Sequence, residues 1–240
     1  MYAIETKNLT KKFKEKTAVN GIDLTINEGE LFALLGTNGA GKTTTIKMLS
    51  TLILPTDGEV KILGMDVVKD SQKIKEILNV SPQKTAIAPN LSVKENLEFM
   101  AGVYQIPNKE AKIDELVKLF KLDEVLKQKA KTLSGGWQRK VSIAIALINE
   151  PKILFLDEPT LGLDVIARKE LWKVIEKLKG NITIILTTHY MEEAESLSDR
   201  VGIMAKGDLV DVGTTEELKT KASTDNFEDA FVKIATGGEL

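Results

Sequence analysis

The chain has 240 residues, with 33 basic and 35 acidic side chains and a net charge of −2. That length suits one large domain or a core with an inserted subdomain. The balanced charge, without any basic block, argues against a nucleic-acid partner. Cysteine is absent, which excludes disulfides and thiol chemistry and agrees with a reducing cytosol.

Membrane-spanning segments are not expected. The longest apolar stretches, at 141–148 and 182–186, are far shorter than the roughly 18 residues needed to cross a bilayer. The first residues, MYAIETKNLTKKF, are too polar for a signal peptide. We therefore expect a soluble protein that reaches a membrane only through a partner.

The N-terminal segment has the alternation of polar and apolar residues that is typical of strands. Residues 1–28 are expected to form an antiparallel hairpin, and the apolar run Leu31–Leu35 predicts a buried strand. Apolar residues at helical spacing then predict a helix over 43–52. A turn at 56–58 is expected to precede another short strand at 59–63.

Helical periodicity dominates the middle of the chain, and short apolar strands return after it. We therefore divide the chain into an α/β core at 1–83 and 151–213, a helical insertion at 84–150 and a helical tail at 214–240. The insertion is expected to begin with a helix opened by Ser92, which forms a capping box with the third residue of the helix.

A glycine-rich loop joins the first buried strand to its helix. Residues 36–43, GTNGAGKT, fit the phosphate-binding pattern GxxxxGK[S/T] in the strand–loop–helix context that this pattern requires. Its three glycines are expected to adopt unusual backbone angles, so that successive N–H groups face phosphate oxygens. Lys42 is expected to reach the β- and γ-phosphates, and the Thr43 hydroxyl to ligate Mg²⁺. The alternative is a flexible glycine turn that only caps a helix.

Two carboxylates end the apolar strand at 153–158, ILFLDE. Asp157, at the tip of this strand, is expected to hold Mg²⁺ through water beside Thr43. Glu158 is expected to orient or deprotonate an attacking water. Two acids after a strand often form a solvated turn, but the preceding glycine loop favours the catalytic interpretation.

Two further polar residues follow predicted strands. His189, the only histidine, closes the run ITIILTTH, and imidazole can bond both a phosphate and a carboxylate. We expect His189 to sense a γ-phosphate beside Glu158, with a purely structural role as the alternative. Gln83 is expected to reach Mg²⁺ or the attacking water and to transmit their presence to the helical insertion. Its alternative role is that of a polar loop residue.

The run Leu133–Gly136, LSGG, precedes the third helix of the insertion. Ser134 is a natural N-cap, but two glycines in a first turn cost about 1 kcal/mol each relative to alanine. Such a weakened helix start is reasonable if bare N–H groups must approach an anion closely. Since the glycine loop already holds this chain's own phosphates, we expect that anion to be the γ-phosphate held by another subunit.

These motifs, in this order, resemble the ATP-binding cassette (ABC) ATPase family over about residues 2–215. In that resemblance the motifs are Walker A (36–43), the Q-loop (Gln83), the signature (133–136), Walker B (153–158), the D-loop (161–164) and the switch histidine (His189). Phe13 matches the aromatic residue that stacks on adenine, and its alternative role is that of an edge-strand core residue. The signature usually continues with glutamine, whereas Trp137 stands there, and indole donates one hydrogen bond and accepts none.

The resemblance implies an α/β P-loop core with a mostly parallel sheet, an N-terminal antiparallel β-subdomain and an inserted all-helical subdomain. The residues predicted to bind ATP are Phe13, Gly36, Asn38, Gly39, Ala40, Gly41, Lys42, Thr43, Thr44, Gln83, Ser134, Gly135 and Gly136. Those predicted to act in catalysis are Lys42, Glu158 and His189, and those predicted to hold Mg²⁺ are Thr43, Gln83 and Asp157.

The family's working unit is a head-to-tail dimer that encloses two ATP molecules. The resemblance therefore implies a second cassette, identical or closely related, and a separate transmembrane permease subunit that holds the cytoplasmic protein on the inner face of the cell membrane. The flanks 44–49 and 227–231 resemble the exporter branch that handles drugs, sodium ions or lipid-linked substrates. An importer, a soluble ABC protein and a P-loop kinase are the alternatives.

Overall fold

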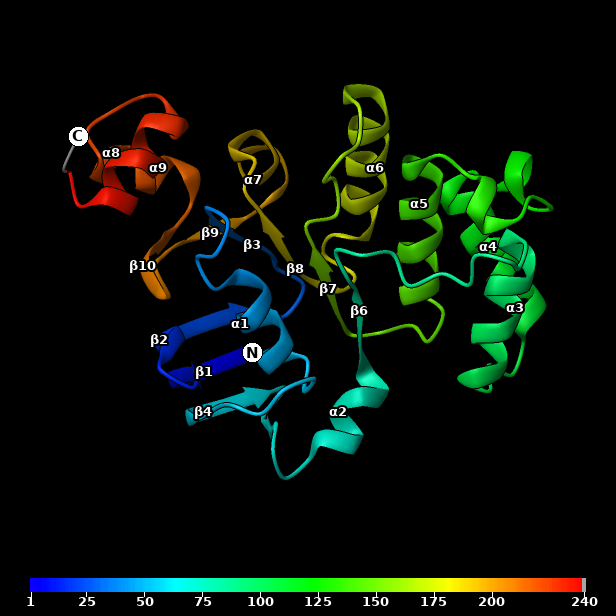
Figure 1. The fold of residues 1–240 in the computed structure, drawn as a ribbon, viewed down its shortest axis with the longest axis horizontal. Coiled ribbons are helices and arrows are strands. Elements are labelled where there is room, and N and C mark those ends of the chain that lie inside the picture. The colour runs from blue at the N-terminus through cyan, green and yellow to red at the C-terminus, as the bar shows by residue number, and fades with distance from the viewer. Residues whose placement is uncertain (239–240) are drawn as a thin grey trace.

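A six-stranded sheet forms the centre of the molecule in the computed structural model, which describes residues 1–238 (Figure 1). Its order is β10-β9-β3-β8-β7-β6. The strands are β3 (Leu31–Gly36), β6 (Leu78–Ser81), β7 (Ile153–Asp157), β8 (Thr183–Thr188), β9 (Arg200–Ala205) and β10 (Asp208–Gly213). All neighbours pair in parallel except β10, which is antiparallel to β9. The mostly parallel sheet confirms the predicted α/β class.

A second, antiparallel sheet contains the N-terminal strands in the order β2-β1-β4-β5. These strands are β1 (Tyr2–Phe13), β2 (Lys16–Asn27), β4 (Asp57–Ile62) and β5 (Met65–Asp66), and β1–β2 is the expected hairpin. The turn expected at 56–58 is wrong, because β4 already begins at Asp57. Gly58 has φ 86° inside this strand, where a Cβ atom would lie 2.2 Å from the Asn8 carbonyl oxygen of β1. Close approach of two strands, rather than a turn, therefore requires this glycine.

Three helices occupy the segment expected to be helical, and they lie together at one end of the molecule (Figure 1). They are α3 (Val93–Val103), α4 (Lys109–Phe120) and α5 (Gly135–Ala146), with short 3₁₀ turns at Asp123–Val125 and Ala130–Thr132. The capping box of α3 is confirmed, because Glu95 N–H donates to Ser92 Oγ and Ser92 N–H donates to Glu95 Oε2.

The remaining helices cover the sheets and end the described chain. They are α1 (Lys42–Leu49), α2 (Ser71–Ile77), α6 (Val165–Leu178), α7 (Met191–Leu197), α8 (Thr215–Lys221) and α9 (Phe227–Thr236). Helix α1 ends at Leu49 rather than at the expected residue 52, because Thr51 adopts a left-handed backbone with φ 62°. The last two residues of the expected tail, 239 and 240, lie outside the described residues. Across residues 1–238, no helix combines the length and apolarity needed to cross a bilayer.

The central strands are buried on both faces, as strands of a covered parallel sheet are. Along β3, Leu31, Ala33 and Leu35 join a core with the helices of the insertion and the C-terminal helices. The alternate residues Phe32 and Leu34 face a second core shared with α1 and the antiparallel sheet. Alternate side chains thus hold β3 between two apolar cores. The C-terminal end of β3 is therefore fixed in position, and so is the start of the glycine loop that follows it.

We predict that Phe120→Ala destabilises the protein by about 3–5 kcal/mol, because Phe120 is 1% exposed in the core of the helical segment. Urea unfolding measures the change. Phe99→Ala is the matched control, since Phe99 is 59% exposed on α3, and we expect it to change stability by no more than about 0.5 kcal/mol. Equal losses for the two variants would contradict the assigned packing.

Candidate functional site

The glycine loop runs from the end of β3 to the start of α1 and bends through left-handed backbone conformations. Gly39 has φ 84° and Gly41 has φ 109°, in the region that glycine adopts most readily. The expectation of unusual backbone angles is wrong for Gly36, whose φ is not positive. Its requirement is steric, because a Cβ atom there would lie 2.5 Å from the Met204 carbonyl oxygen of β9.

Lys42 opens α1 and turns its ammonium back over the loop. Its Nζ donates to the Gly36 carbonyl at 2.7 Å and to the Thr37 carbonyl at 3.2 Å, and it lies 3.5 Å from Glu158 Oε1. Burial lowers the pKa of Lys42, and the neighbouring Glu158 and Asp157 carboxylates oppose that shift. The buried ammonium is therefore held between backbone carbonyls and a carboxylate, at a loop shaped to accept an anion.

Asp157 ends β7 and receives two hydroxyl groups on one carboxylate oxygen. Thr43 Oγ1 donates to Asp157 Oδ1 at 3.0 Å, and Thr187 Oγ1 donates to the same atom at 2.6 Å. Thr187 also accepts a bond from Glu158 N–H at 3.0 Å. Sequence reasoning missed Thr187, although its place two residues before His189 and its register opposite Asp157 in β8 are the signal that identifies it.

Glu158 follows Asp157 in a strained conformation. Its φ is 48°, which is uncommon for a residue with a side chain, and it is buried. One carboxylate oxygen faces Lys42, and the other lies 2.9 Å from Nδ1 of His189. The Nδ1–H tautomer of His189 donates to this carboxylate. Backbone strain at a buried acid between a lysine and a histidine is typical of a functional site.

Lys42, Thr43 and Glu158 border a cavity of about 280 Å³ at the glycine loop. Its lining residues are Lys16, Ala18, Asn38, Gly39, Ala40, Gly41, Lys42, Thr43, Thr44, Gln83 and Glu158. The structure thus brings Gln83 to the same cavity as the glycine loop, from the segment after β6. Lys16 and Ala18 of β2 also line it, and sequence reasoning missed both because nothing in a strand pattern says which loop lies beside it.

Phe13 is placed next to this region but does not line the cavity. It ends β1 opposite Lys16, is 48% exposed, and has the Lys11 ammonium 5.3 Å from its ring centroid. The alternative of an edge-strand core residue is wrong, because nearly half of this side chain is exposed. An exposed ring beside the cavity remains available for stacking.

The signature segment 133–136 lies outside this cavity, at the start of α5. Ser134 occupies the N-cap position of α5, but its side chain makes no capping hydrogen bond, and Ser134 and Gly135 are exposed. Both glycines were expected to let an anion approach the backbone, but Gly136 has another reason to be glycine. A Cβ atom there would lie 3.2 Å from the Ala167 Cβ atom of α6. Packing therefore accounts for Gly136, whereas the open surroundings of Gly135 leave its backbone accessible.

Trp137 and Gln138 have separate roles in the first turn of α5. The Lys140 ammonium lies 4.5 Å from the Trp137 ring centroid, within cation–π range. The Gln138 amide donates to the Ala130 and Leu133 carbonyls, both at 3.2 Å. Gln138 therefore supports the backbone that leads into Ser134, and Trp137 packs along the outside of the helix.

Glu193 of α7 is a buried acid that sequence reasoning missed. Its Oε1 accepts bonds from Thr160 Oγ1 at 2.8 Å and Trp172 Nε1 at 3.0 Å, and its Oε2 has no partner in the described part of the chain. Burial raises the pKa of Glu193, against the effect of these hydrogen bonds and of the Arg168 charge. Glu193 therefore connects the segment after Glu158 with α6 and α7.

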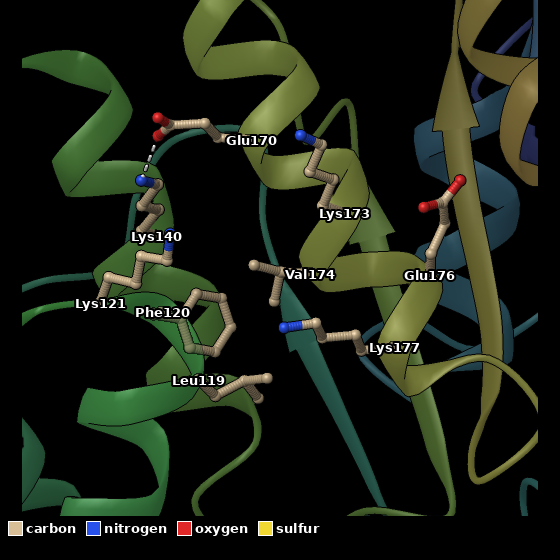
Figure 2. A pocket seen from close by; sticks show the side chains of 9 residues that line it. All are labelled: Leu119, Phe120, Lys121, Lys140, Glu170, Lys173, Val174, Glu176 and Lys177. Atoms are coloured by element: carbon tan, nitrogen blue, oxygen red, sulfur yellow. Dashed lines mark hydrogen bonds and ion pairs between the residues drawn. The ribbon is translucent and has the colours of Figure 1, made fainter.

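A larger cavity, of about 480 Å³, shares no residue with the predicted site. Figure 2 shows its position between the end of α4, the side of α5 and α6, with the Lys140–Glu170 ion pair across one edge. The side chains of Phe120 and Val174 form its apolar part (Figure 2). The chemically equipped cavity is thus the smaller one, at the glycine loop.

The residues around the glycine loop fit a nucleoside triphosphate with a divalent cation. Left-handed glycines expose backbone N–H groups, and Lys42 supplies a positive charge. The Thr43 hydroxyl and the Asp157 carboxylate lie together and offer the oxygen donors that Mg²⁺ prefers.

Comparison with known proteins gives one consistent family. The family model described as "ABC transporter" matches residues 19–161. The probable multidrug ABC transporter ATP-binding protein YbhF of Escherichia coli (strain K12) is 38% identical over 96% of this chain and 41% of its own length. The linearmycin resistance ATP-binding protein LnrL of Bacillus subtilis (strain 168) is 37% identical over 93% of this chain and 73% of its own length. The chain thus spans less than half of the first relative.

A solved structure has the same fold. It is the dimeric structure of a post-hydrolysis state of the ATP-binding cassette MJ0796 bound to ADP and Pi, with a TM-score of 0.79 and 28% identity. The likeness covers 88% of this chain and 98% of that one.

We predict that Glu193→Gln flattens the pH dependence of stability. Because the folded pKa of Glu193 is raised, the free energy of unfolding of the unmodified protein should fall as pH rises from the unfolded pKa, about 4.3, through the folded one. An amide cannot ionise and avoids this loss. Urea unfolding at pH 5 and pH 8 measures the free energy of unfolding of both proteins. Between these pH values it should fall less for Glu193→Gln than for the unmodified protein.

Glu195→Gln, on the exposed face of the same helix, is the matched control for this prediction. We expect it to leave the change between the two pH values within about 0.5 kcal/mol. The same fall in stability for Glu193→Gln and the unmodified protein would contradict a raised Glu193 pKa.

Proposed function

The chain belongs to the ABC transporter family, and from that premise we propose that it is the ATP-hydrolysing subunit of a transporter. The observation that carries the proposal is the direct contact between side chains that follow three neighbouring strands of the central sheet. Lys42 follows β3, Glu158 follows β7 and His189 follows β8, and contacts of 3.5 Å and 2.9 Å join them in that order. An anion-binding lysine, a candidate base and a candidate γ-phosphate sensor thus meet at the glycine loop.

The substrate is ATP, bound with its phosphates against the glycine loop. Backbone N–H groups of the loop and of the first turn of α1 hold the phosphates, and Lys42 neutralises part of their charge. Thr43 and Asp157 hold Mg²⁺, with Gln83 at the cavity wall as a further oxygen donor. When bound, Mg²⁺ neutralises charge on the phosphates and makes the γ-phosphorus easier to attack.

Hydrolysis needs an oriented water molecule, and Glu158 accepts its proton or orients it. Thr187 fixes the backbone of Glu158 through its hydroxyl, and His189 fixes the carboxylate from the side. His189 also reaches the γ-phosphate through its other ring nitrogen. Pre-ordered donors of this kind stabilise the transition state because they need not reorganise during the reaction.

The proposed active unit is a head-to-tail dimer in which the signature segment of one copy completes the site of the other. Two observations support it. Ser134 and Gly135 are exposed and lie outside the chain's own phosphate cavity. The MJ0796 cassette, which this chain resembles, is described as dimeric with ADP and Pi.

The proposed partner is a transmembrane permease subunit, with this protein bound to it on the inner face of the membrane. The relatives support this role, since they are named as a probable multidrug transporter component and a linearmycin resistance protein. We propose export as the direction of transport. Closure of the dimer on ATP and its opening after hydrolysis drive the permease between two states.

Glu158→Gln is expected to lower the ATPase rate at least about 100-fold, because an amide cannot accept a proton. ATP binding should persist, so gel filtration with Mg-ATP should show a dimer that is lost when nucleotide is removed. Monomers at every ATP concentration would count against the shared site, and phosphate release unchanged from the parent would remove Glu158 from catalysis.

Ser134→Arg is expected to prevent the signature segment of one copy from completing the phosphate site of the other. A bulky cation at this exposed N-cap blocks the approach of a second copy, so the ATPase rate should fall at least about tenfold, a barrier increase near 1.4 kcal/mol. ATP binding to the isolated chain, measured by fluorescent-nucleotide displacement, should stay within about twofold. Thr132→Arg, at an exposed position just before the segment, is the matched control. Equal rates for Ser134→Arg and the control would refute the assignment.

A further inference from the structure

Side chains join helix α5, and the turn that follows it, to β6 and to the Gln83 segment. The contacts are Asn79 Nδ2 to Asn149 Oδ1 at 2.9 Å, Ser81 Oγ to Ser142 Oγ at 3.1 Å, Arg139 Nη1 to the Pro82 carbonyl at 2.8 Å and Arg139 Nη2 to the Gln83 carbonyl at 2.6 Å. They follow the strand from its start to the phosphate cavity. The helix that begins at the signature is therefore fastened to the segment that carries Gln83.

Arg139 is the contact nearest to the cavity. It is 5% exposed, and within residues 1–238 no carboxylate lies within ion-pair distance of its guanidinium. A buried cation is costly unless its donors are bonded, so the two backbone carbonyls are its compensation. Burial lowers the pKa of Arg139, and the more distant carboxylates of Asp157, Glu193 and Glu158 oppose that shift. Moving Gln83 away from α5 would leave this cation without acceptors.

The opposite face of α5 is attached more weakly. Lys140 is buried, but its partner in α6, Glu170 at 2.7 Å, is 55% exposed, so water screens this ion pair from one side. The 480 Å³ cavity separates the neighbouring parts of α4 and α6 (Figure 2). On the side of the Gln83 segment α5 is bonded and buried, whereas on the side of α6 it borders a cavity and one ion pair whose carboxylate is exposed.

We propose that Arg139 is a positioning residue that makes the Gln83 segment and helix α5 move as one body. ATP bound beside Gln83 thereby sets the orientation of Ser134, which faces the second copy. This inference rests on the proposed function and names the residue that connects one site of the dimer to the other.

The geometry supports this connection. The two Arg139 bonds hold consecutive carbonyls, so they anchor both peptide groups that flank the Cα atom of Gln83. Ser134 precedes Arg139 by five residues, or about 7.5 Å along the helix axis. A shift of Gln83 toward bound ATP must either break two charge-assisted bonds or carry the start of α5 with it.

The test compares Arg139→Met and Arg139→Lys with Lys140→Gln, a neighbouring control on the same helix. In Arg139→Met we expect the ATPase rate to fall at least about tenfold while the Kd for ATP stays within about twofold. Arg139→Lys keeps the charge but spans the two carbonyls poorly, so it should recover part of the rate. Lys140→Gln should keep the parent rate. Thermal unfolding of each variant identifies any that fails to fold.

A double-mutant cycle with Gln83→Ala separates coupling from simple structural support. If Arg139 acts through Gln83, Arg139→Met should lower the rate less than twofold once Gln83 is already alanine. A tenfold loss in both backgrounds would assign Arg139 a structural role only and overturn the proposal. Because the cycle compares rates within each background, this result is interpretable even if Arg139→Met is less stable.

A distance measurement detects the motion itself. The chain has no cysteine, so Lys61→Cys in β4 and Lys118→Cys in α4, both exposed, give two unique sites for nitroxide labels in the Glu158→Gln background. Mg-ATP should shift the label distance with Arg139 or with Lys140→Gln present, and not with Arg139→Met. An equal shift with Arg139→Met overturns the inference alone. A parent that neither binds nor hydrolyses ATP overturns the proposed function instead.

Discussion

Buried charge at the ends of parallel strands is the constraint on which this structure depends. Lys42 and Glu158 are both almost completely buried and lie 3.5 Å apart, and neither charge is tolerable there without partners. Backbone carbonyls of the glycine loop and the imidazole of His189 supply those partners. The sheet order, with β3 beside β8 and β8 beside β7, brings them together from distant parts of the sequence.

The two apolar cores hold these strand ends in register. Each central strand contributes alternate residues to both cores, so a slip by one residue would reverse every side chain and separate the polar groups. The strained backbone of Glu158, with φ 48°, is held by the same packing and by Thr187. The strained backbone of Glu158 persists because the surrounding packed sheet is stable enough to hold it.

The helical segment shares an apolar core with the central strands, and polar contacts add a direct link from α5 to the Gln83 segment. Arg139 bonds the peptide that carries Gln83, while the Lys140 side of α5 borders a cavity. This asymmetry suits a rotation of α5. The Arg139 bonds transmit a displacement of the Gln83 segment to the helix, and the cavity on the Lys140 side leaves room for the helix to move. In the proposed dimer, this arrangement relates occupancy of one phosphate site to the position of the signature segment offered to the other copy.

Local sequence determined the strands and helices that flank the glycine loop, the capping box at Ser92 and the mostly parallel class, because these follow from short-range periodicity and backbone chemistry. Tertiary structure alone decided why Gly36 and Gly58 are glycines, since the atoms that exclude a Cβ belong to Met204 and Asn8. It also decided that Thr187 bonds Asp157 and that Arg139 bonds the Gln83 segment. Such pairs are set by strand order and helix docking, and no pattern within either segment encodes its distant neighbour.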